Sequence, residues 1–576
     1  MIRQVPAGID PLSVKTPKLA TPTTDVQSPA ASVGESALAA SFVFVEQDKP
    51  VLARHPTVIH TTDVVEKILI PGEDKQAVVH SVTVSHPVRL ESAVMLVTTL
   101  RIVLLEDETV CTIPLTSVLD IHQTSSKTAS LALDIKTKDC RFFQLSLNDA
   151  TSKTSLLKLI TSLVFSIGPT DLFPLVRKSR GLHSLHDSPF NIHSELERFG
   201  RENYFTVTDH NSDFSVCHTY PRHLMVPSAT SKETLLGSSR FRDKGRVPVL
   251  SWASPDLATG CMWRSSQPKS FILNRSADDE EYLKQAQIMF IIDCRPMLNA
   301  YANIAHGAGV ESLGNYHKGI ELWFAGIQNI HHVRDGWEKM FLLAQQHYTS
   351  GSGLLSNSSS GQSSWFNGLE SAGWIELIAS VLRASSVLVE KISSGINVLC
   401  RCSHGLDRTP QVVSLAMLAM DPYYRTITGF AVLIEKEWVA MGHRFHSRYC
   451  IGSAPHDDVS PIFSQWIECV YQLVVQNSDE FEFSHEYLVA ILAGALSGKF
   501  GTFLFDSEKE RIERGSIGED EKIVESIWPA LWEKRDMYVN HNFEKRSTGK
   551  RLSIDYRISN LHVLPQLWLS HLRIDI

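Results

Sequence analysis

Residues 396–420, which read INVLCRCSHGLDRTPQVVSLAMLAM, set the tightest limits on the fold and chemistry of this chain. An apolar strand pattern runs into Cys402, a short loop follows with Gly405 in its middle, and an apolar helical pattern begins near Thr409. The start of a helix presents unpaired backbone N–H groups and the positive end of the helix dipole. A strand that leads through a glycine-containing loop into a helix therefore predicts a cradle for a phosphate-sized anion.

Cys402 and Arg408 supply reactive groups to this cradle. The helix dipole and the charge of Arg408 favour the thiolate of Cys402, which is a strong nucleophile toward phosphorus. The planar guanidinium of Arg408 matches two oxygens of a phosphate, and Gly405 lets successive N–H groups turn inward. The pattern predicts two in-line displacements through a phosphocysteine, with no metal and no cofactor. Cys400, two residues earlier, better fits a buried strand position.

Asp407 and the pair Arg444 and Arg448 each allow two interpretations. Asp407 could protonate the leaving alkoxide, or it could cap the helix N-terminus, which is a common role for Asp. Arg444 and Arg448 are four residues apart and share one face if the stretch is helical. Together with His443 and His446 they form either a solvated basic face or a cationic patch that binds a second anionic group.

From about residue 190, strand-like and helical patterns alternate, which is the signature of an α/β domain. MFIID (289–293) and INVLC (396–400) read as strands, and GWIELIASVLRASSVLVEKI (373–392) reads as a helix. The segment 349–364, TSGSGLLSNSSSGQSS, interrupts this pattern. Its composition favours a flexible surface insertion between two helices over a phosphorylated regulatory loop.

The region before this domain is β-rich. A helical pattern at 152–167 follows its strands, so we expect a small barrel of the pleckstrin-homology type closed by one C-terminal helix. The expected strands lie at 78–84, 94–106, 111–115, 130–135 and 140–147. Residues 1–45 are rich in Ala, Ser, Thr and Pro and read as a disordered tail.

Composition excludes several classes of protein. The chain has 576 residues, 43% of them hydrophobic, with 55 Lys and Arg against 63 Asp and Glu. These values exclude a wholly disordered, collagen-like or small disulfide-rich chain, and a net charge of −8 disfavours sequence-independent binding of nucleic acid. The nine cysteines show no CxxC pair or zinc spacing. No stretch reaches about 18 apolar residues, and the N-terminus does not read as a secretory signal.

CSHGLDRT at 402–409 and DPYYRTITGFAVLIEKEWVAMGHRF at 421–445 closely resemble the myotubularin phosphoinositide 3-phosphatases. The resemblance covers about 200–540, and the β region lies where myotubularins carry a PH-GRAM domain. Further matching blocks follow in the family's order: YPRHLMVP (220–227), GRVPVLSW (245–252), RSSQP (264–268), IIDCRPMLNAYAN (291–303), QNIH (328–331), SPIFSQWIECVYQL (460–473) and FGTFLFDSEKER (500–511).

The resemblance implies an α+β multidomain chain with three parts after the tail. A PH-GRAM domain is expected at 50–175, a protein-tyrosine-phosphatase-like domain with a central sheet flanked by helices at 190–540, and a C-terminal extension at 541–576. The extension shows no sustained heptads, so a coiled coil is not evident.

The resemblance also implies removal of the D3 phosphate from phosphatidylinositol 3-phosphate and phosphatidylinositol 3,5-bisphosphate. Cys402 matches the nucleophile, Asp407 the proposed acid and Arg408 the arginine of the cradle. The other positions match residues that bind substrate: Ser403, His404, Gly405 and Leu406 in the cradle, Arg444 and Arg448 at the D1 phosphate, and Asn303, Asn329 and Ile330 along the same pocket. Implied partners are phosphoinositide lipids and homo- or hetero-oligomers with other myotubularins, in the cytoplasm and peripherally on endosomal membranes.

Three loop positions depart from the family pattern: Arg401 stands for a His, His404 for an Asp and Leu406 for a Trp. A protonated His404 would add positive charge beside the phosphate. Two alternatives therefore stay open. One is a catalytically weak or inactive phosphoinositide-binding scaffold that partners another myotubularin. The other is a protein phosphotyrosine phosphatase, although a peptide substrate offers no second phosphate to Arg444 and Arg448.

Overall fold

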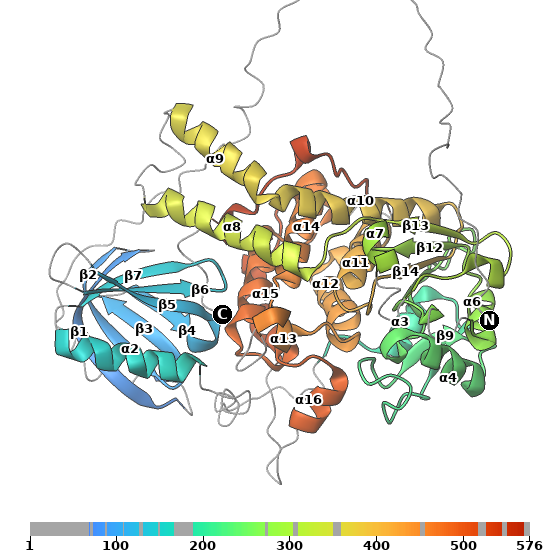
Figure 1. Ribbon diagram of the computed structural model, residues 1–576, viewed down its shortest axis with the longest axis horizontal. Helices are drawn as coiled ribbons and strands as arrows, with labels where there is room; N and C mark the ends of the chain where they lie inside the picture. Colours follow the sequence, from blue (N-terminus) through green and yellow to red (C-terminus); the bar gives the residue numbers. More distant parts are fainter. Residues whose placement is uncertain are drawn as a thin grey trace, which may run out of the picture. The chain divides into compact units, whose positions relative to one another are not determined.

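The described helices and strands of the computed structural model all fall within residues 61–576 (Figure 1). The described residues are 68–69, 73–86, 89–106, 109–125, 131–147, 150–165, 188–270, 275–302, 309–349, 359–449, 456–515, 526–543 and 550–568. The predicted tail at 1–45 lies outside these ranges, as do residues 350–358 of the predicted insertion. Residues 359–364 of that insertion form the start of helix α9 (Ser359–Ala372).

The β-rich region forms one antiparallel seven-stranded sheet in the order β4-β3-β2-β1-β7-β6-β5, followed by helix α2 (Ala150–Phe165). Apolar residues of the sheet share one core with Leu156 and Ile160 of the helix. The strands are β1 (Lys75–His86), β2 (Leu90–Thr98), β3 (Arg101–Glu106), β4 (Thr109–Pro114), β5 (Val118–Ser125), β6 (Leu131–Thr137) and β7 (Phe142–Leu147).

The predicted single strand at 94–106 is wrong, because a tight turn divides it into β2 and β3. The hydroxyl of Thr98 accepts hydrogen bonds from the backbone N–H groups of Leu100 and Arg101, so it stabilises a turn inside an apolar run. Such a side-chain-supported turn needs neither Gly nor Pro. The sequence pattern also missed β5, whose alternation is interrupted by polar residues.

The second domain has a five-stranded sheet in the order β10-β11-β14-β12-β13. β10 pairs antiparallel with β11, and the other neighbours are parallel. The strands are β10 (Val249–Trp252), β11 (Met262–Ser265), β12 (Phe290–Asp293), β13 (Glu321–Phe324) and β14 (Val398–Arg401). The chain is therefore α+β as predicted. The central strand, β14, is the one that leads into the active-site loop.

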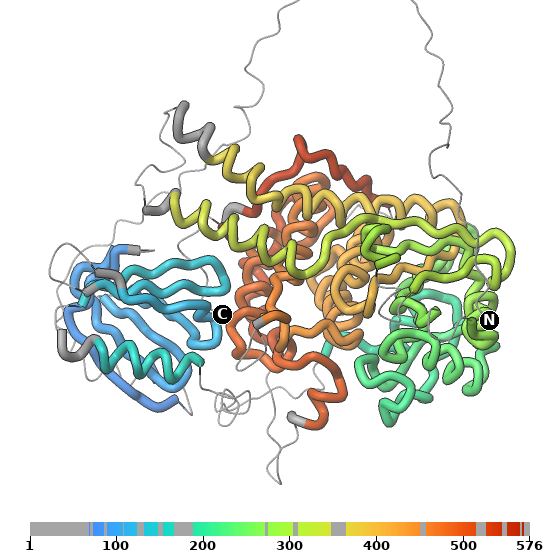
Figure 2. The backbone as a smooth tube through the Cα atoms, viewed as in Figure 1, coloured from blue at the N-terminus to red at the C-terminus, as the bar shows by residue number. Residues whose placement is uncertain are grey.

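Helices surround this sheet (Figures 1 and 2). Among the described helices, α10 and α11 form the most extensive contact. A separate two-stranded sheet pairs β8 (Phe205–Thr208) with β9 (Leu224–Pro227). The helices of the domain are α3 (Ile192–Phe199), α4 (Lys232–Phe241), α6 (Ala277–Gln285), α7 (Met297–Ala302), α8 (Ile330–Thr349), α9, α10 (Trp374–Ser393), α11 (Arg408–Met420), α12 (Ile427–Ile434), α13 (Phe445–Tyr449), α14 (Ile462–Gln476), α15 (His485–Ser497), α16 (Glu508–Gly515), α17 (Ile527–Glu533) and α18 (Pro565–Trp568).

The described part of the C-terminal extension packs into the core of this second domain. The ring of Trp568 lies 4.5 Å from that of Trp337 and 5.8 Å from that of Trp374. Leu552 donates its backbone N–H to Ala419 at the end of α11. The extension therefore seals the hydrophobic core behind the active-site helix.

Within the described residues, no single helix has the length and apolar composition needed to cross a membrane. Residues 365–372 of α9 and helix α10 reach that threshold only together, across a bend of 53°.

Candidate active site

The loop between β14 and α11 curls around the sulfur of Cys402. The backbone N–H of Gly405 donates a hydrogen bond to this sulfur at 3.2 Å. Gly405 has φ +69°, and a Cβ at this position would lie 2.5 Å from the carbonyl oxygen of Ser265. Both the left-handed backbone and the close approach of β11 require glycine here.

The surroundings of Cys402 make its thiol more acidic than that of an ordinary cysteine. Burial works against a charged sulfur, but the charge of Arg408 and hydrogen bonding from Thr409 outweigh it and lower the pKa of Cys402. The side chain is nearly covered, with 3% of the residue exposed. The sulfur is therefore an activated nucleophile at the base of the loop.

Arg408 is held by weak contacts to neutral oxygens. Its guanidinium donates to the backbone carbonyl of Ile327 at 3.3 Å and to the hydroxyl of Ser403 at 3.4 Å. Among the described residues it forms no ion pair within 4 Å, which contrasts with most buried arginines of this domain. Its charge is consequently available to an incoming phosphate.

Two arginines that sequence reasoning did not single out hold the loop from below. Arg264 and Arg246 both donate to the carbonyl of Gly405, at 2.8 and 3.2 Å. Arg264 also pairs with Glu437 at 2.8 Å, and the Arg246 guanidinium lies 4.1 Å from the centre of the Tyr220 ring. They occur in the blocks 264–268 and 245–252, so the family resemblance was the signal that could have found them.

Asp407 occupies the N-cap position of α11, yet its carboxylate makes no capping hydrogen bond. Arg448 donates to both carboxylate oxygens instead, at 2.9 and 2.8 Å. Burial opposes ionisation of Asp407, but the charge of Arg448, assisted by His443, holds its pKa well below the usual range. In this arrangement Asp407 is an anion.

Arg444 and Arg448 are brought together by one helical turn, because the N–H of Arg448 donates to the carbonyl of Arg444 at 2.7 Å. Both guanidiniums also contact the carboxylate of Asp458, at 3.1 and 3.5 Å. The prediction that His443 belongs to an exposed basic face is wrong. His443 is 1% exposed and shares a hydrogen bond of 2.9 Å with the carbonyl of Leu406.

The remaining loop positions point in different directions. The backbone carbonyl of Ser403 accepts a hydrogen bond from the N–H of Gln267 at 3.1 Å. His404 is exposed, and its Nδ1 pairs with the carboxylate of Asp243. Leu406 is buried, with 2% of the residue exposed. The covered side chain of Leu406 packs under the loop, whereas His404 faces solvent. The predicted substrate contacts of these residues stay predictions.

Asn303 lies outside the described residues. Asn329 and Ile330 stand at the start of α8, where the Asn329 side-chain oxygen accepts from the N–H groups of His331 and His332 at 3.1 and 3.2 Å. The carbonyl of Ile330 accepts from the hydroxyl of Ser460 at 2.8 Å. The structure therefore shows both residues in contacts that cap and anchor α8, and their predicted role in lining the substrate pocket stays a prediction.

Arg401, which precedes the nucleophile, points away from the cradle into a fully buried ion-pair network. It contacts Asp293 at 2.7 Å and both oxygens of Glu311, which Arg242 also contacts at 2.7 Å. Arg242 and Arg401 hold the pKa of Glu311 at about 2 despite its burial. Arg401 therefore joins β14 to β12 and to residue 311, and its side chain does not point into the predicted phosphate cradle.

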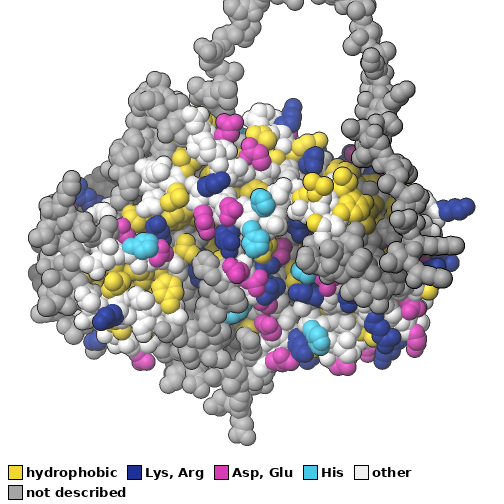
Figure 3. Space-filling view, viewed as in Figure 1, with side chains coloured by type: hydrophobic (Ala, Val, Ile, Leu, Met, Phe, Trp, Pro, Cys, Tyr) yellow, Lys and Arg dark blue, Asp and Glu magenta, His cyan; other side chains and the backbone are white. Residues whose placement is uncertain are grey.

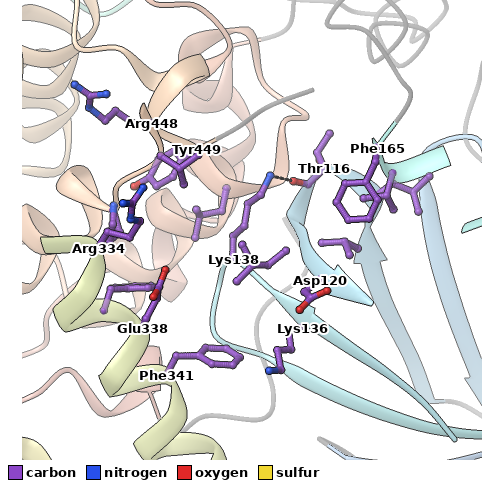
Figure 4. A pocket seen from close by; sticks show the side chains of 18 of the residues that line it. Thr116, Asp120, Lys136, Lys138, Phe165, Arg334, Glu338, Phe341, Arg448 and Tyr449 are labelled. Atoms are coloured by element: carbon purple, nitrogen blue, oxygen red, sulfur yellow. Dashed lines mark hydrogen bonds between the residues drawn. The ribbon is translucent and has the colours of Figure 1, made fainter. Parts of the chain in front are cut away.

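A cavity of about 660 Å³ reaches Arg448 from the side of the N-terminal sheet (Figure 4). Lys136 and Phe165 line it from the β-rich region, and Arg334 and Phe341 line it from α8. The side chain of Lys138 crosses this space to donate to the carbonyl of Thr116 at 2.6 Å. The cavity therefore lies next to the active site, which it meets at Arg448.

A family model, the myotubularin-like phosphatase domain, matches residues 175–512. The chain belongs to the myotubularin family. It is 38% identical to phosphatidylinositol-3,5-bisphosphate 3-phosphatase MTMR8 of Gallus gallus over 69% of this chain and 62% of that protein. It is 38% identical to phosphatidylinositol-3-phosphate phosphatase MTMR7 of Mus musculus over 61% and 52%, and 34% identical to Myotubularin of Xenopus laevis over 77% and 72%.

This member of the family therefore spans about half to two thirds of the length of the first two relatives. The matched region contains the cradle, both strands beside it and the Arg444–Arg448 turn. The myotubularin loop of this chain thus keeps its Cys, Gly, Asp and Arg while carrying Arg401, His404 and Leu406 around them.

Proposed function

We propose that this chain is a phosphoinositide 3-phosphatase that acts on phosphatidylinositol 3-phosphate and phosphatidylinositol 3,5-bisphosphate. The observation that carries the proposal is the geometry of the loop, in which the N–H of Gly405 donates to the buried Cys402 sulfur at 3.2 Å and the nearby Arg408 has no ion-pair partner among the described residues. The lowered pKa of the Cys402 thiol supports it. A strongly basic guanidinium next to an activated thiolate suits a phosphate monoester. The names of the relatives supply the substrate class.

The first chemical step is an in-line attack by the thiolate of Cys402 on the D3 phosphorus. Arg408 binds two of the equatorial oxygens, and inward-facing N–H groups of the loop, held in place through the carbonyl of Gly405, bind the phosphate in its transition state. The bond from phosphorus to the inositol oxygen breaks as the phosphorus–sulfur bond forms. The product is a phosphocysteine and an inositol alkoxide that needs a proton.

Asp407 can supply this proton only after its ion pair with Arg448 is broken, because that ion pair keeps the carboxylate ionised. A D1 phosphate that binds Arg448 would draw the guanidinium away from Asp407. The pKa of Asp407 would then rise, and the carboxyl could take up a proton and pass it to the leaving oxygen. Substrate binding and acid catalysis are thereby coupled through one arginine.

In the second step, water attacks the phosphocysteine, with Asp407 as the base, and releases inorganic phosphate. Cys402 returns to the thiolate, which its surroundings already favour.

The β-rich region with its C-terminal helix is proposed to be a PH-GRAM domain, on the strength of its strand order and its place before the phosphatase domain. Because the substrate lies in a bilayer, we propose a cytoplasmic protein that associates peripherally with endosomal membranes and assembles with other myotubularins. The visible face carries acidic and basic side chains interspersed (Figure 3). Such a surface favours recognition of a head group by the pocket over general attraction to anionic lipid.

The altered loop residues do not by themselves favour an inactive scaffold, because Cys402, Asp407 and Arg408 are retained beside them. Arg401 is buried in the ion-pair network, Leu406 is covered, and His404 is directed outward to Asp243. The scaffold and the phosphotyrosine phosphatase therefore remain as outcomes of the test.

The test is phosphate release from short-chain phosphoinositides and from a phosphotyrosine peptide, with Cys402→Ser as the control. The proposal requires release from the two D3-phosphorylated lipids and none from the Ser variant. Lipid binding without any release would establish the scaffold. Faster release from the peptide than from the lipids would establish the protein phosphatase.

A further inference from the structure

Cys294 directly follows β12, and Cys402 directly follows β14. In the parallel pair of β12 and β14, Ile292 aligns with Cys400 and Asp293 with Arg401. The next step of the register brings Cys294 beside Cys402, and the N–H of Cys294 donates to the carbonyl of Arg401 at 2.8 Å. Neighbouring strands lie about 4.8 Å apart, and a disulfide spans Cα atoms about 4.4–6.8 Å apart. If the register continues past Asp293 and Arg401, the Cα atoms of Cys294 and Cys402 fall within the range that a disulfide spans.

The side chains of these cysteines share one face of the sheet. Residues two apart on a strand point to the same side, so Cys400 and Cys402 face the side that holds Cys294. The sulfur atoms of Cys294 and Cys400 are 3.6 Å apart, which fixes the direction of the Cys294 side chain toward β14. Cys402 is also among the charges that act on Cys294.

Cys402 and Cys294 differ in reactivity. Cys402 tends to the thiolate, whereas burial and the neighbouring Cys400 raise the pKa of Cys294 well above its ordinary value. A thiolate reacts with peroxide and a thiol does not. Peroxide therefore oxidises Cys402 first, while Cys294 remains a thiol.

We propose that Cys294 is the resolving cysteine of a reversible oxidation of the active site, forming a disulfide with Cys402. The Cys402 thiolate attacks one oxygen of hydrogen peroxide, the oxygen–oxygen bond breaks, hydroxide leaves, and Cys402 becomes a sulfenic acid. The sulfur of Cys294 then attacks the sulfenic sulfur, the sulfur–oxygen bond breaks, and the Cys294 proton leaves with the oxygen as water. The two thiols lose two electrons, and peroxide gains them.

This disulfide protects the nucleophile. A sulfenic acid that meets no thiol is oxidised further to sulfinic acid, which ordinary thiol reductants do not reverse. The disulfide removes the thiolate and the hydrogen bond from Gly405 to its sulfur, so it stops catalysis, and reduction restores both. The inference rests on the proposed function for its activity readout, although the disulfide itself can be detected without that activity.

The experiment treats the full chain with hydrogen peroxide and maps its peptides without reduction. Phosphate release from phosphatidylinositol 3-phosphate is measured before and after dithiothreitol. We expect a linked peptide pair containing Cys294 and Cys402, with most activity recovered on reduction. In Cys294→Ala the pair disappears, Cys402 accumulates as sulfinic acid, and the recovered activity falls several-fold.

Cys400→Ala is the matched control, because Cys400 lies on the same face but aligns with Ile292. It should keep both the linked pair and the recovery. Finding only a Cys294–Cys400 disulfide, or equal recovery in the wild type and Cys294→Ala, would overturn the proposal. A linked pair in a chain that shows no phosphatase activity would instead refute the proposed function and leave this inference standing. If a variant fails to fold, the peptide map of the wild-type chain still shows whether Cys294 and Cys402 form a disulfide.

Discussion

Arg448 donates two hydrogen bonds to the carboxylate of Asp407, from Nε to Oδ1 at 2.9 Å and from Nη2 to Oδ2 at 2.8 Å. The resemblance assigns one of these residues to the substrate's D1 phosphate and the other to acid catalysis. The structure shows that both cannot perform these roles while they hold each other. The ion pair therefore makes the proton donor dependent on substrate binding.

Substitution of Arg448 tests this dependence. Arg448→Met removes charge-assisted hydrogen bonds worth about 1.5–3 kcal/mol, so kcat/KM should fall about tenfold to hundredfold. Because the charge of Arg448 lowers the pKa of Asp407, its removal raises that pKa, and the pH–rate profile of kcat/KM should shift toward higher pH. Arg444→Met is the control, since Arg444 contacts Asp458 and Asp506 but not Asp407. Equal shifts in both variants would disprove the coupling.

Gly405→Ala tests the backbone of the cradle. An alanine there would adopt a left-handed conformation that costs about 1–2 kcal/mol, and its Cβ would lie 2.5 Å from the Ser265 carbonyl. We expect activity to fall by at least about tenfold, because the N–H groups of the loop must shift. Gly314→Ala is the matched control, since a Cβ at Gly314 meets no atom within 4 Å. Similar activity in the two variants would show that the loop tolerates the change.

Arg401→Met tests the ion-pair network behind the nucleophile. The substitution removes one of the two buried arginines that contact each carboxylate, leaving Asp293 with Arg295 and Glu311 with Arg242. Breaking a buried ion pair completely costs about 3–5 kcal/mol, so this is the upper bound for the loss. The midpoint of urea unfolding should fall markedly. Arg557→Met, which breaks an exposed ion pair with Asp555, should leave the midpoint near that of the wild type. A shift of the same size in both would mean that Arg401 contributes no more than a surface charge.

Glu468 makes stability depend on pH. Burial raises its pKa from 4.5 to about 8, even though the indole N–H groups of Trp568 and Trp374 counteract this. The folded state therefore keeps a proton that the unfolded state loses, so the contribution of Glu468 to stability is greatest below pH 4.5 and falls as the pH rises to about 8.

Glu468→Gln cannot ionise and can still accept the hydrogen bond from Trp568. We expect it to be more stable than the wild type to urea, by an amount that grows from about pH 5 to pH 8, since one pKa unit corresponds to about 1.4 kcal/mol. Glu390→Gln, at an exposed position of α10, serves as the control and should show no such trend. A constant difference between wild type and Glu468→Gln across this range would refute the ionisation argument.

The sequence alone determined the elements around the cradle. Helix α10 begins within one residue of its predicted start, and α11 begins at Arg408, one residue before the predicted position. Apolar periodicity identifies these elements because their buried faces repeat at fixed intervals. The pattern failed between β2 and β3, where the Thr98 hydroxyl forms a turn inside an apolar run.

Only the tertiary structure decided what the side chains of the site contact. The sequence identifies Cys402 and Arg408 because they lie within one short loop. It could not show that Asp407 is held by Arg448, that Arg246 and Arg264 meet at the Gly405 carbonyl, or that Arg401 turns away from the site. Local periodicity records which residues are buried, whereas partners far apart in sequence are chosen by how strands and helices pack. The register that sets Cys294 beside the nucleophile is a result of that packing.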